Sequence, residues 1–170
     1  MSPNDKEIND AIMLYEKALV HQQSGEIDNA IKCYKDAISK NPNLWQAQNN
    51  LANLILYKGE YDEAIYLYKK ALELDSENPI IQNNIGNVLI GQRKFQEAKK
   101  WFSKSLKKDP NYVEAISNFG LCLAEENKID EAETYFRKAI KINPSFSNAY
   151  NNLAMILKKK EKFYEAVKEY

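Results

Sequence analysis

The sequence is poor in the residues from which most catalytic and metal sites are built. Its 170 residues include one histidine, His21, and two cysteines, Cys33 and Cys122. A single imidazole leaves almost nothing for a histidine-based metal site or a histidine-centred relay. Two cysteines so far apart in the chain give no disulfide framework. We therefore expect no metal and no cofactor, and a reducing, cytoplasmic location.

Neither positive nor negative charge is in excess in this sequence, and arginine is rare. The 24 basic residues are balanced by 24 acidic ones, and only Arg93 and Arg137 carry a guanidinium group. Zero net charge argues against a broad electrostatic grip on nucleic acid or an anionic membrane. No apolar run approaches the roughly 20 residues of a membrane span. We expect neither a nucleic-acid partner nor membrane insertion.

Enzyme motifs are missing as well. The sequence contains no glycine-rich phosphate loop, no Gly-x-Ser-x-Gly and no His-Glu-x-x-His. The adjacent carboxylates of Glu125 and Glu126 fall in a predicted turn with no acid–base partner in the sequence nearby, so we expect both to be solvated. The pattern predicts a protein that is not an enzyme.

What the sequence does contain is a period of 34 residues. Alanine recurs at this spacing at Ala30, Ala64, Ala98, Ala132 and Ala166. An aromatic residue recurs at Tyr34, Tyr68, Phe102, Phe136 and Tyr170. A fixed period of this length is typical of repeat proteins, in which each unit packs on its neighbours. The columns place repeats at 11–44, 45–78, 79–112, 113–146 and 147–170, the last one partial, with 1–10 as an N-terminal extension of the first helix.

Each repeat has the pattern of two helices joined by a tight turn. Apolar residues follow the i, i+3, i+4 and i+7 spacing on both sides of a turn position that is filled by Gly25 and Gly59 in the first two repeats. Glycine there can take a positive φ and end the first helix. Asn127 tolerates this conformation, whereas Arg93 and Glu161 are less suited to it. The pattern predicts an all-α chain of antiparallel helix pairs.

Proline marks the end of the second helix in three of the repeats. The second repeat has Ser76 at this position and carries Asn78 and Pro79 shortly afterwards. Asparagine is a favourable N-cap residue, and proline is favourable at the first helical position. We expect Asn78 to cap the helix that Pro79 begins.

The period, with small residues at repeat positions 8, 20 and 27, an aromatic at 24 and proline at 32, resembles the tetratricopeptide repeat. The segment 50–75 follows that pattern almost throughout. The resemblance implies a single domain over 1–170, a right-handed superhelical solenoid of about five helix pairs whose first helices line a concave groove. Lys17 and His21 depart from the pattern, which suggests a more polar N-terminal cap.

In such a groove, the sequence would place columns of asparagine. The resemblance predicts a peptide-binding groove that includes Asn49, Asn50, Asn53, Tyr57, Asn83, Asn84, Asn87, Asn118 and Asn152. Repeats about 10 Å apart would offer one amide for about every third residue of an extended peptide. This arrangement is similar to the asparagine ladder of protein O-linked N-acetylglucosamine transferases. The same amides could instead bond neighbouring helices.

The expected function is a protein–protein interaction scaffold that binds a peptide segment of a partner. The alternative is the substrate-recruiting arm of a larger enzyme, such as a protein O-linked glycosyltransferase; a third, weaker reading is a purely architectural spacer. A clamp for the carboxylate of a chaperone tail is disfavoured, because the predicted groove positions of the first three repeats include no basic residue. Tyr57 is the best aromatic anchor.

The sequence stops where a second helix of the fifth repeat is expected to be incomplete. The apolar face that would carry Ala166 and Tyr170 would then be uncovered. We expect either a fragment of a longer protein or an end that is covered by another molecule, for instance in a homo-oligomer.

Overall fold

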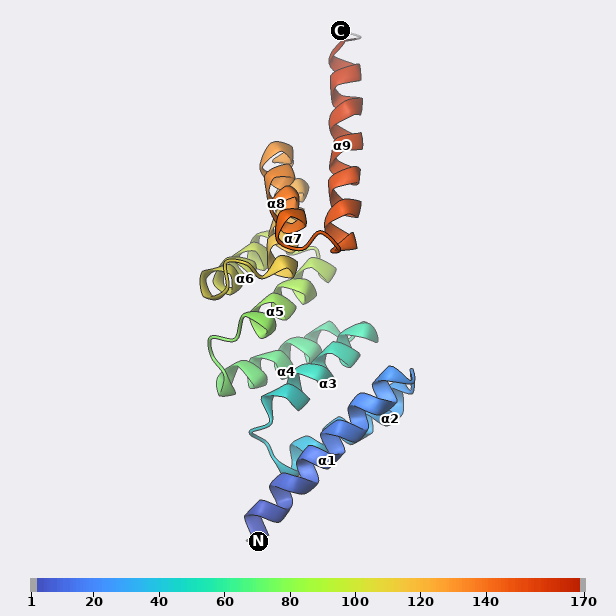
Figure 1. Cartoon of the computed structure of the whole chain (residues 1–170), viewed down its shortest axis with the longest axis vertical. Coiled ribbons are helices and arrows are strands. Elements are labelled where there is room, and N and C mark those ends of the chain that lie inside the picture. The colour runs from blue at the N-terminus through green and yellow to red at the C-terminus, as the bar shows by residue number, and fades with distance from the viewer. Residues whose placement is uncertain (1–2, 169–170) are drawn as a thin grey trace. The chain divides into compact units, whose positions relative to one another are not determined.

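The computed structural model describes residues 3–168, with the side chains of residues 5–161 (Figure 1). Over the described range the chain forms nine α-helices and no strand. Their bounds are α1 Pro3–Gln23, α2 Ile27–Lys40, α3 Trp45–Tyr57, α4 Tyr61–Leu74, α5 Pro79–Gly91, α6 Phe95–Lys108, α7 Val113–Glu125, α8 Ile129–Ile142 and α9 Ser147–Lys168. The all-α prediction is therefore confirmed.

The chain divides into two compact units, and the division falls within α5. The N-terminal unit comprises residues 1–84, and the C-terminal unit comprises residues 85–170. In the N-terminal unit α1 packs against α2, α2 against α3, and α3 against α4. In the C-terminal unit α6 packs against α7, α7 against α8, and α9 against both α7 and α8 (Figure 1).

The repeating small and aromatic residues form the core of each helix pair. The alanine column is fully buried at Ala30, Ala64, Ala98 and Ala132. The aromatic column is fully buried at Tyr34, Tyr68, Phe102 and Phe136. Small side chains let two helices approach, and one large ring per repeat fills the space that remains between them. Burial of a ring of this size removes about 150–250 Å² from water, which makes this column a major source of stability.

The turn between the two helices of a repeat uses a left-handed residue, as the sequence predicts. Gly25 and Gly59 have φ of 74° and 81°. Asn127 takes the same conformation with φ of 62°, and so does Arg93 with φ of 58°. Arg93 adopts it although a side chain with a Cβ is disfavoured there by about 1–2 kcal/mol. The geometry of the helix pair therefore overrides the preference of this one residue.

The connection between α4 and α5 is closed by the predicted cap. Oδ1 of Asn78 accepts hydrogen bonds from the backbone N–H groups of Ile80 and Ile81 at 3.0 and 3.2 Å. Pro79 is the first residue of α5 and needs no N–H partner there. Asn78 thus satisfies two of the N–H groups that a helix start leaves without intrahelical partners.

The fifth repeat differs from the expectation of a turn near Glu161. α9 instead continues without interruption from Ser147 to Lys168. Glu161, like Arg93 in the third repeat, has no preference for a positive φ, and the lysines and glutamate around it are good helix formers. The predicted apolar end face falls on Tyr170 and the side chain of Ala166, which lie outside the described residues.

Candidate functional site

Asparagines of α3 connect this helix to the first repeat. Nδ2 of Asn50 donates to the hydroxyl oxygens of Tyr15 and Tyr34, at 3.2 and 3.5 Å. Nδ2 of Asn49 donates to Oδ1 of Asn50 at 3.2 Å. Because Tyr15 lies on α1 and Tyr34 on α2, one amide bridges three helices.

The same chain of amides reaches α5. Nδ2 of Asn84 donates to Oδ1 of Asn49 at 3.0 Å and to Oδ1 of Asn53 at 3.4 Å. The hydroxyl of Tyr68, on α4, donates to Oδ1 of Asn53 at 2.5 Å. These four asparagines and three tyrosines form what we call the amide network of the N-terminal unit.

Two polar groups of the amide network remain without an intramolecular partner in the described part of the chain. They are the amide Nδ2 of Asn53 and the carbonyl Oδ1 of Asn84, and both side chains are only partly buried. The side chains of Asn49 and Asn83, which were expected to line a groove, are instead buried, with 6% and 2% exposure. Only part of the predicted asparagine set is thus placed where a ligand could reach it.

The C-terminal unit has a smaller set of amide contacts. Nδ2 of Asn118, on α7, donates to Oδ1 of Asn87, on α5, at 2.8 Å. Nδ2 of Asn152, on α9, donates to Oγ of Ser117 at 3.2 Å. Asparagines at repeat position 6 therefore bond a neighbouring first helix in both units, which is the structural role that the sequence left open.

The tyrosine hydroxyls of the network were not identified from the sequence. Burial raises the pKa of Tyr34 to about 12, although the hydrogen bond from Asn50 acts in the opposite direction. Burial also raises the pKa of Tyr68. Both phenols thus stay neutral and keep their protons for hydrogen bonding. The signal was present in the aromatic column, which has tyrosine in the first two repeats and phenylalanine in the next two.

Apolar side chains are also accessible on the first helices of the N-terminal unit. Tyr57, at the end of α3, is 79% exposed. Ile12 on α1 and Ile80 on α5 are 41% and 43% exposed. Tyr57 therefore stands on the surface, where an aromatic anchor has to stand. Its predicted part in binding remains a prediction.

The expectation for the carboxylates of the α7–α8 turn is wrong for one of them. Glu126 is held by an ion pair with Lys99 of α6 and by a second one with Lys128 at 3.1 Å. The hydrogen bond from Lys99 is the main reason why the pKa of Glu126 lies below its usual range. The sequence could not show this contact, because the two partners are 27 residues apart.

No group of three or more histidine, cysteine, aspartate or glutamate side chains in the described range is arranged to hold a metal ion. None of the helices described there has both the length and the apolar character needed to cross a bilayer.

Comparison with protein-family models identifies the repeat throughout most of the chain. Models described as tetratricopeptide repeat match residues 11–44, 33–66, 79–112, 113–146 and 135–168, and one described as TPR repeat matches residues 53–92. A comparison with curated protein sequences finds no match.

Solved structures of similar fold include several repeat proteins. YrrB, described as a TPR protein with an unusual peptide-binding site, is 26% identical with a TM-score of 0.68, and the match covers 94% of this chain and 84% of YrrB. PilF of Pseudomonas aeruginosa is 24% identical with a TM-score of 0.80, and the match covers 98% of this chain and 75% of PilF.

A third structure is the first TPR of Spaghetti (RPAP3), bound to the HSP90 peptide SRMEEVD. It is 24% identical with a TM-score of 0.64, and the match covers 69% of this chain and 93% of that one. At this level of identity, the likeness to PilF and to Spaghetti concerns the fold alone.

Two observations together assign the family: repeat models match from residue 11 to residue 168, and the repeating small and aromatic residues are buried in the helix pairs. The chain belongs to the tetratricopeptide repeat family.

Proposed function

We propose that the chain binds an extended segment of another protein on the first-helix surface of its N-terminal unit, through contacts to the main chain of that segment. The observation that carries the proposal is the pair Asn53 and Asn84. Each amide is held in place by internal hydrogen bonds and still leaves one polar group without an intramolecular partner in the described structure.

The chemistry of this pair complements a peptide group. Nδ2 of Asn53 is a donor that suits a main-chain carbonyl, and Oδ1 of Asn84 is an acceptor that suits a main-chain N–H. The two amides are bonded to each other and to Tyr68 and Asn49, so little side-chain entropy would be lost on binding. Contacts of this kind read the main chain, so they favour tolerance for different partner sequences.

The surroundings of the pair favour a ligand with little charge. Among the side chains of the predicted groove positions on α1, α3 and the start of α5, only Glu16 is charged. A terminal carboxylate would find no lysine or arginine there. Exposed Tyr57 offers an apolar contact for one side chain of the bound segment. YrrB, whose structure is described by its peptide-binding site, supports the same class of ligand.

The test is the substitution Asn53→Asp in the full chain. It keeps the oxygen that accepts from Tyr68 and Asn84, and it removes the amide donor that faces the ligand. Peptides are first selected by the wild type from a random displayed library, and the affinity of one of them is then measured by fluorescence anisotropy. Loss of one hydrogen bond and the repulsion of a carbonyl by the new carboxylate should weaken binding by about tenfold or more.

The matched control is Gln96→Glu, which introduces the same charge at an exposed position of α6. It should leave the affinity unchanged. Circular dichroism of both variants separates a binding effect from a folding effect. If the Asn53→Asp protein folds and binds the selected peptide as tightly as the wild type, main-chain recognition by this pair is excluded.

A further inference from the structure

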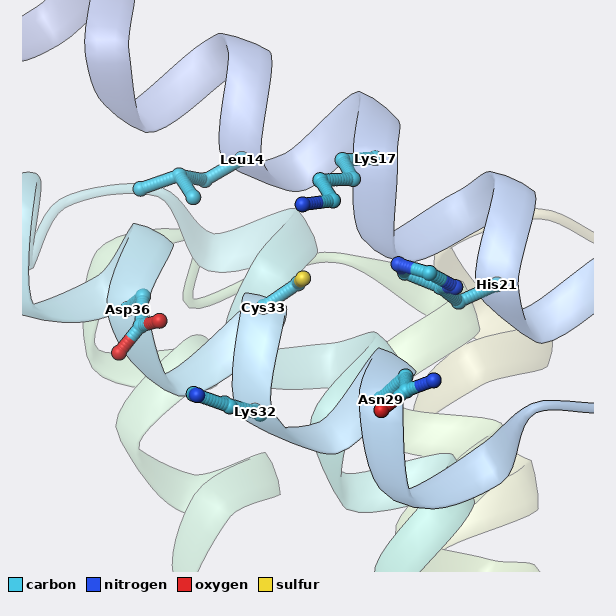
Figure 2. Close-up of a pocket in the computed structure, with 7 residues that line it drawn as sticks. All are labelled: Leu14, Lys17, His21, Asn29, Lys32, Cys33 and Asp36. Atoms are coloured by element: carbon cyan, nitrogen blue, oxygen red, sulfur yellow. The ribbon is translucent and has the colours of Figure 1, made fainter.

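The first repeat contains a pocket between its two helices, apart from the amide network. The pocket has a volume of about 380 Å³ and lies in the seam between α1 and α2. Figure 2 shows Lys17 and Cys33 extending towards one another from the two helices, with the ring of His21 beside them. Its lining consists of Leu14, Lys17, His21, Asn29, Lys32, Cys33 and Asp36.

The pocket exists because two large apolar side chains are missing. Repeat positions 7 and 23 carry Lys17 and Cys33 in the first repeat. In the fourth repeat the same positions carry Phe119 and Tyr135, whose ring centroids are 4.8 Å apart. The second and third repeats also have two apolar residues at these positions. A lysine and a small thiol cannot fill the space that two rings fill, and the seam stays open.

The charges of the pocket are only partly compensated. Lys17 of α1 and Lys32 of α2 make no ion pair within the described residues. Glu26, which does not line the pocket, is already engaged, since Nδ1 of His21 lies 2.6 Å from its Oε2 and Asn29 donates to the same oxygen at 2.9 Å. Asp36 is the one carboxylate in the lining, and its negative charge partly offsets the positive charges of the two ammonium groups.

We propose that this pocket binds the phosphate group of a small molecule. A phosphate group carries about −1.5 to −2 charges at neutral pH and three acceptor oxygens. The lining includes two ammonium groups from facing helices, which match the charge of a phosphate dianion better than that of a singly charged carboxylate ligand. The volume of the pocket also admits a small organic substituent. The pocket does not include the amide network, so this proposal is independent of peptide binding.

The experiment titrates the full chain with inorganic phosphate at constant pH, against sodium chloride of equal ionic strength. His21 is the single histidine of the sequence, so its imidazole protons give an unambiguous NMR signal inside the pocket. Cys33 is 7% exposed and lines the pocket, so the rate at which a thiol reagent modifies it is a second readout, which phosphate should slow. Cys122 is fully buried and should not react in either case.

We expect saturable changes in both signals with phosphate and not with chloride. Lys17→Met and Lys32→Met should each weaken binding about fivefold, and Asp36→Asn should tighten it about threefold because it removes the opposing charge. Lys35→Met removes an exposed lysine of α2 that does not line the pocket, and it should change nothing.

Non-saturable changes, or equal affinity in the wild type and the folded Lys17→Met/Lys32→Met double variant, would overturn the proposal. Should the double variant not fold, Asp36→Asn decides alone. Unchanged or weaker phosphate binding by that variant would equally exclude the site.

Discussion

The ring of Phe102 occupies the space in which a side chain of residue 86 would lie. A Cβ placed on Gly86 would be 2.4 Å from Cε1 and 2.6 Å from Cζ of that ring. The next repeat shows the same relationship at Gly120, where a Cβ would lie 2.9 Å from Cε1 of Phe136. In both cases glycine lets the backbone of a first helix approach the ring of the second helix.

Gly86→Ala should therefore destabilise the C-terminal unit. The ring of Phe102 is fully buried and would have to shift within the packed core, so overpacking should cost about 1–3 kcal/mol. Urea denaturation followed by circular dichroism measures this loss. Gly120→Ala is the graded comparison and should cost less, since its nearest contact is longer. Equal stability of wild type and Gly86→Ala would show that the ring is free to shift.

Arg93→Gly should stabilise the protein. The left-handed conformation of this residue, with φ of 58°, costs an arginine about 1–2 kcal/mol and a glycine nearly nothing. The greater freedom of glycine in the unfolded chain and the loss of the Arg93–Phe95 ring contact reduce the gain to about 0.5–1 kcal/mol.

Thermal or urea unfolding tests the effect of this substitution. The adjacent Lys94→Gly is the control, because Lys94 has a φ of −89° and glycine relieves no left-handed conformation there. A melting temperature of Arg93→Gly at or below that of Lys94→Gly would contradict the interpretation.

Tyr68→Phe should weaken the amide network without creating a cavity. The variant loses the hydrogen bond from the hydroxyl to Asn53, and Oδ1 of Asn53 keeps only the longer one from Asn84. The expected loss of stability is about 1 kcal/mol, to be measured by urea denaturation. Tyr66→Phe, which removes the hydroxyl of an exposed tyrosine on the same helix, should be neutral. A similar change in unfolding free energy for both variants would show that the hydrogen bond of Tyr68 in the amide network does not contribute to stability.

Glu126 should make the stability of the C-terminal unit depend on acidity. Its pKa is lowered in the folded state, chiefly by Lys99, so its contribution is complete above an unfolded pKa of about 4.3 and is lost as the pH falls through the lower folded value. Glu126→Gln should consequently flatten the decrease in unfolding free energy below about pH 4.3. Glu125→Gln, at an exposed carboxylate next to it, should leave that decrease unchanged. Equal slopes for wild type and Glu126→Gln would exclude the pair as a source of the acid dependence.

The helix pairs could be predicted because they depend on residues that recur. Alanine and aromatic columns define which faces are buried, and the turn residue marks where a first helix ends. The sequence did not predict the unbroken α9, because the 34-residue period places a turn at Glu161. The poor fit of glutamate to that turn was the one sign against it. Arg93 does not favour a positive φ either and still forms a turn, whereas at Glu161 the helix preference of the lysine-rich segment decided the outcome.

The candidate site was predicted less well, because an amide can turn either of its ends to a neighbour. The spacing placed Asn50 and Asn84 on first helices. It could not show that Asn50 donates to the hydroxyl of Tyr34, which lies on the second helix of the first repeat. Asn49 is buried and Asn53 is only partly buried, although both accept a hydrogen bond from Asn84, and the spacing of the two residues gives no indication of this difference in exposure.

The uninterrupted course of α9 carries it past the last ion pairs described between this helix and α8. Its 22 residues span about 33 Å, and the last ion pairs described between it and α8 are those of Lys160 with Asp130 and Glu133. About 12 Å of helix follows Lys160. A label attached near Lys168 would therefore report on the part of α9 that lies beyond its described ion pairs with α8.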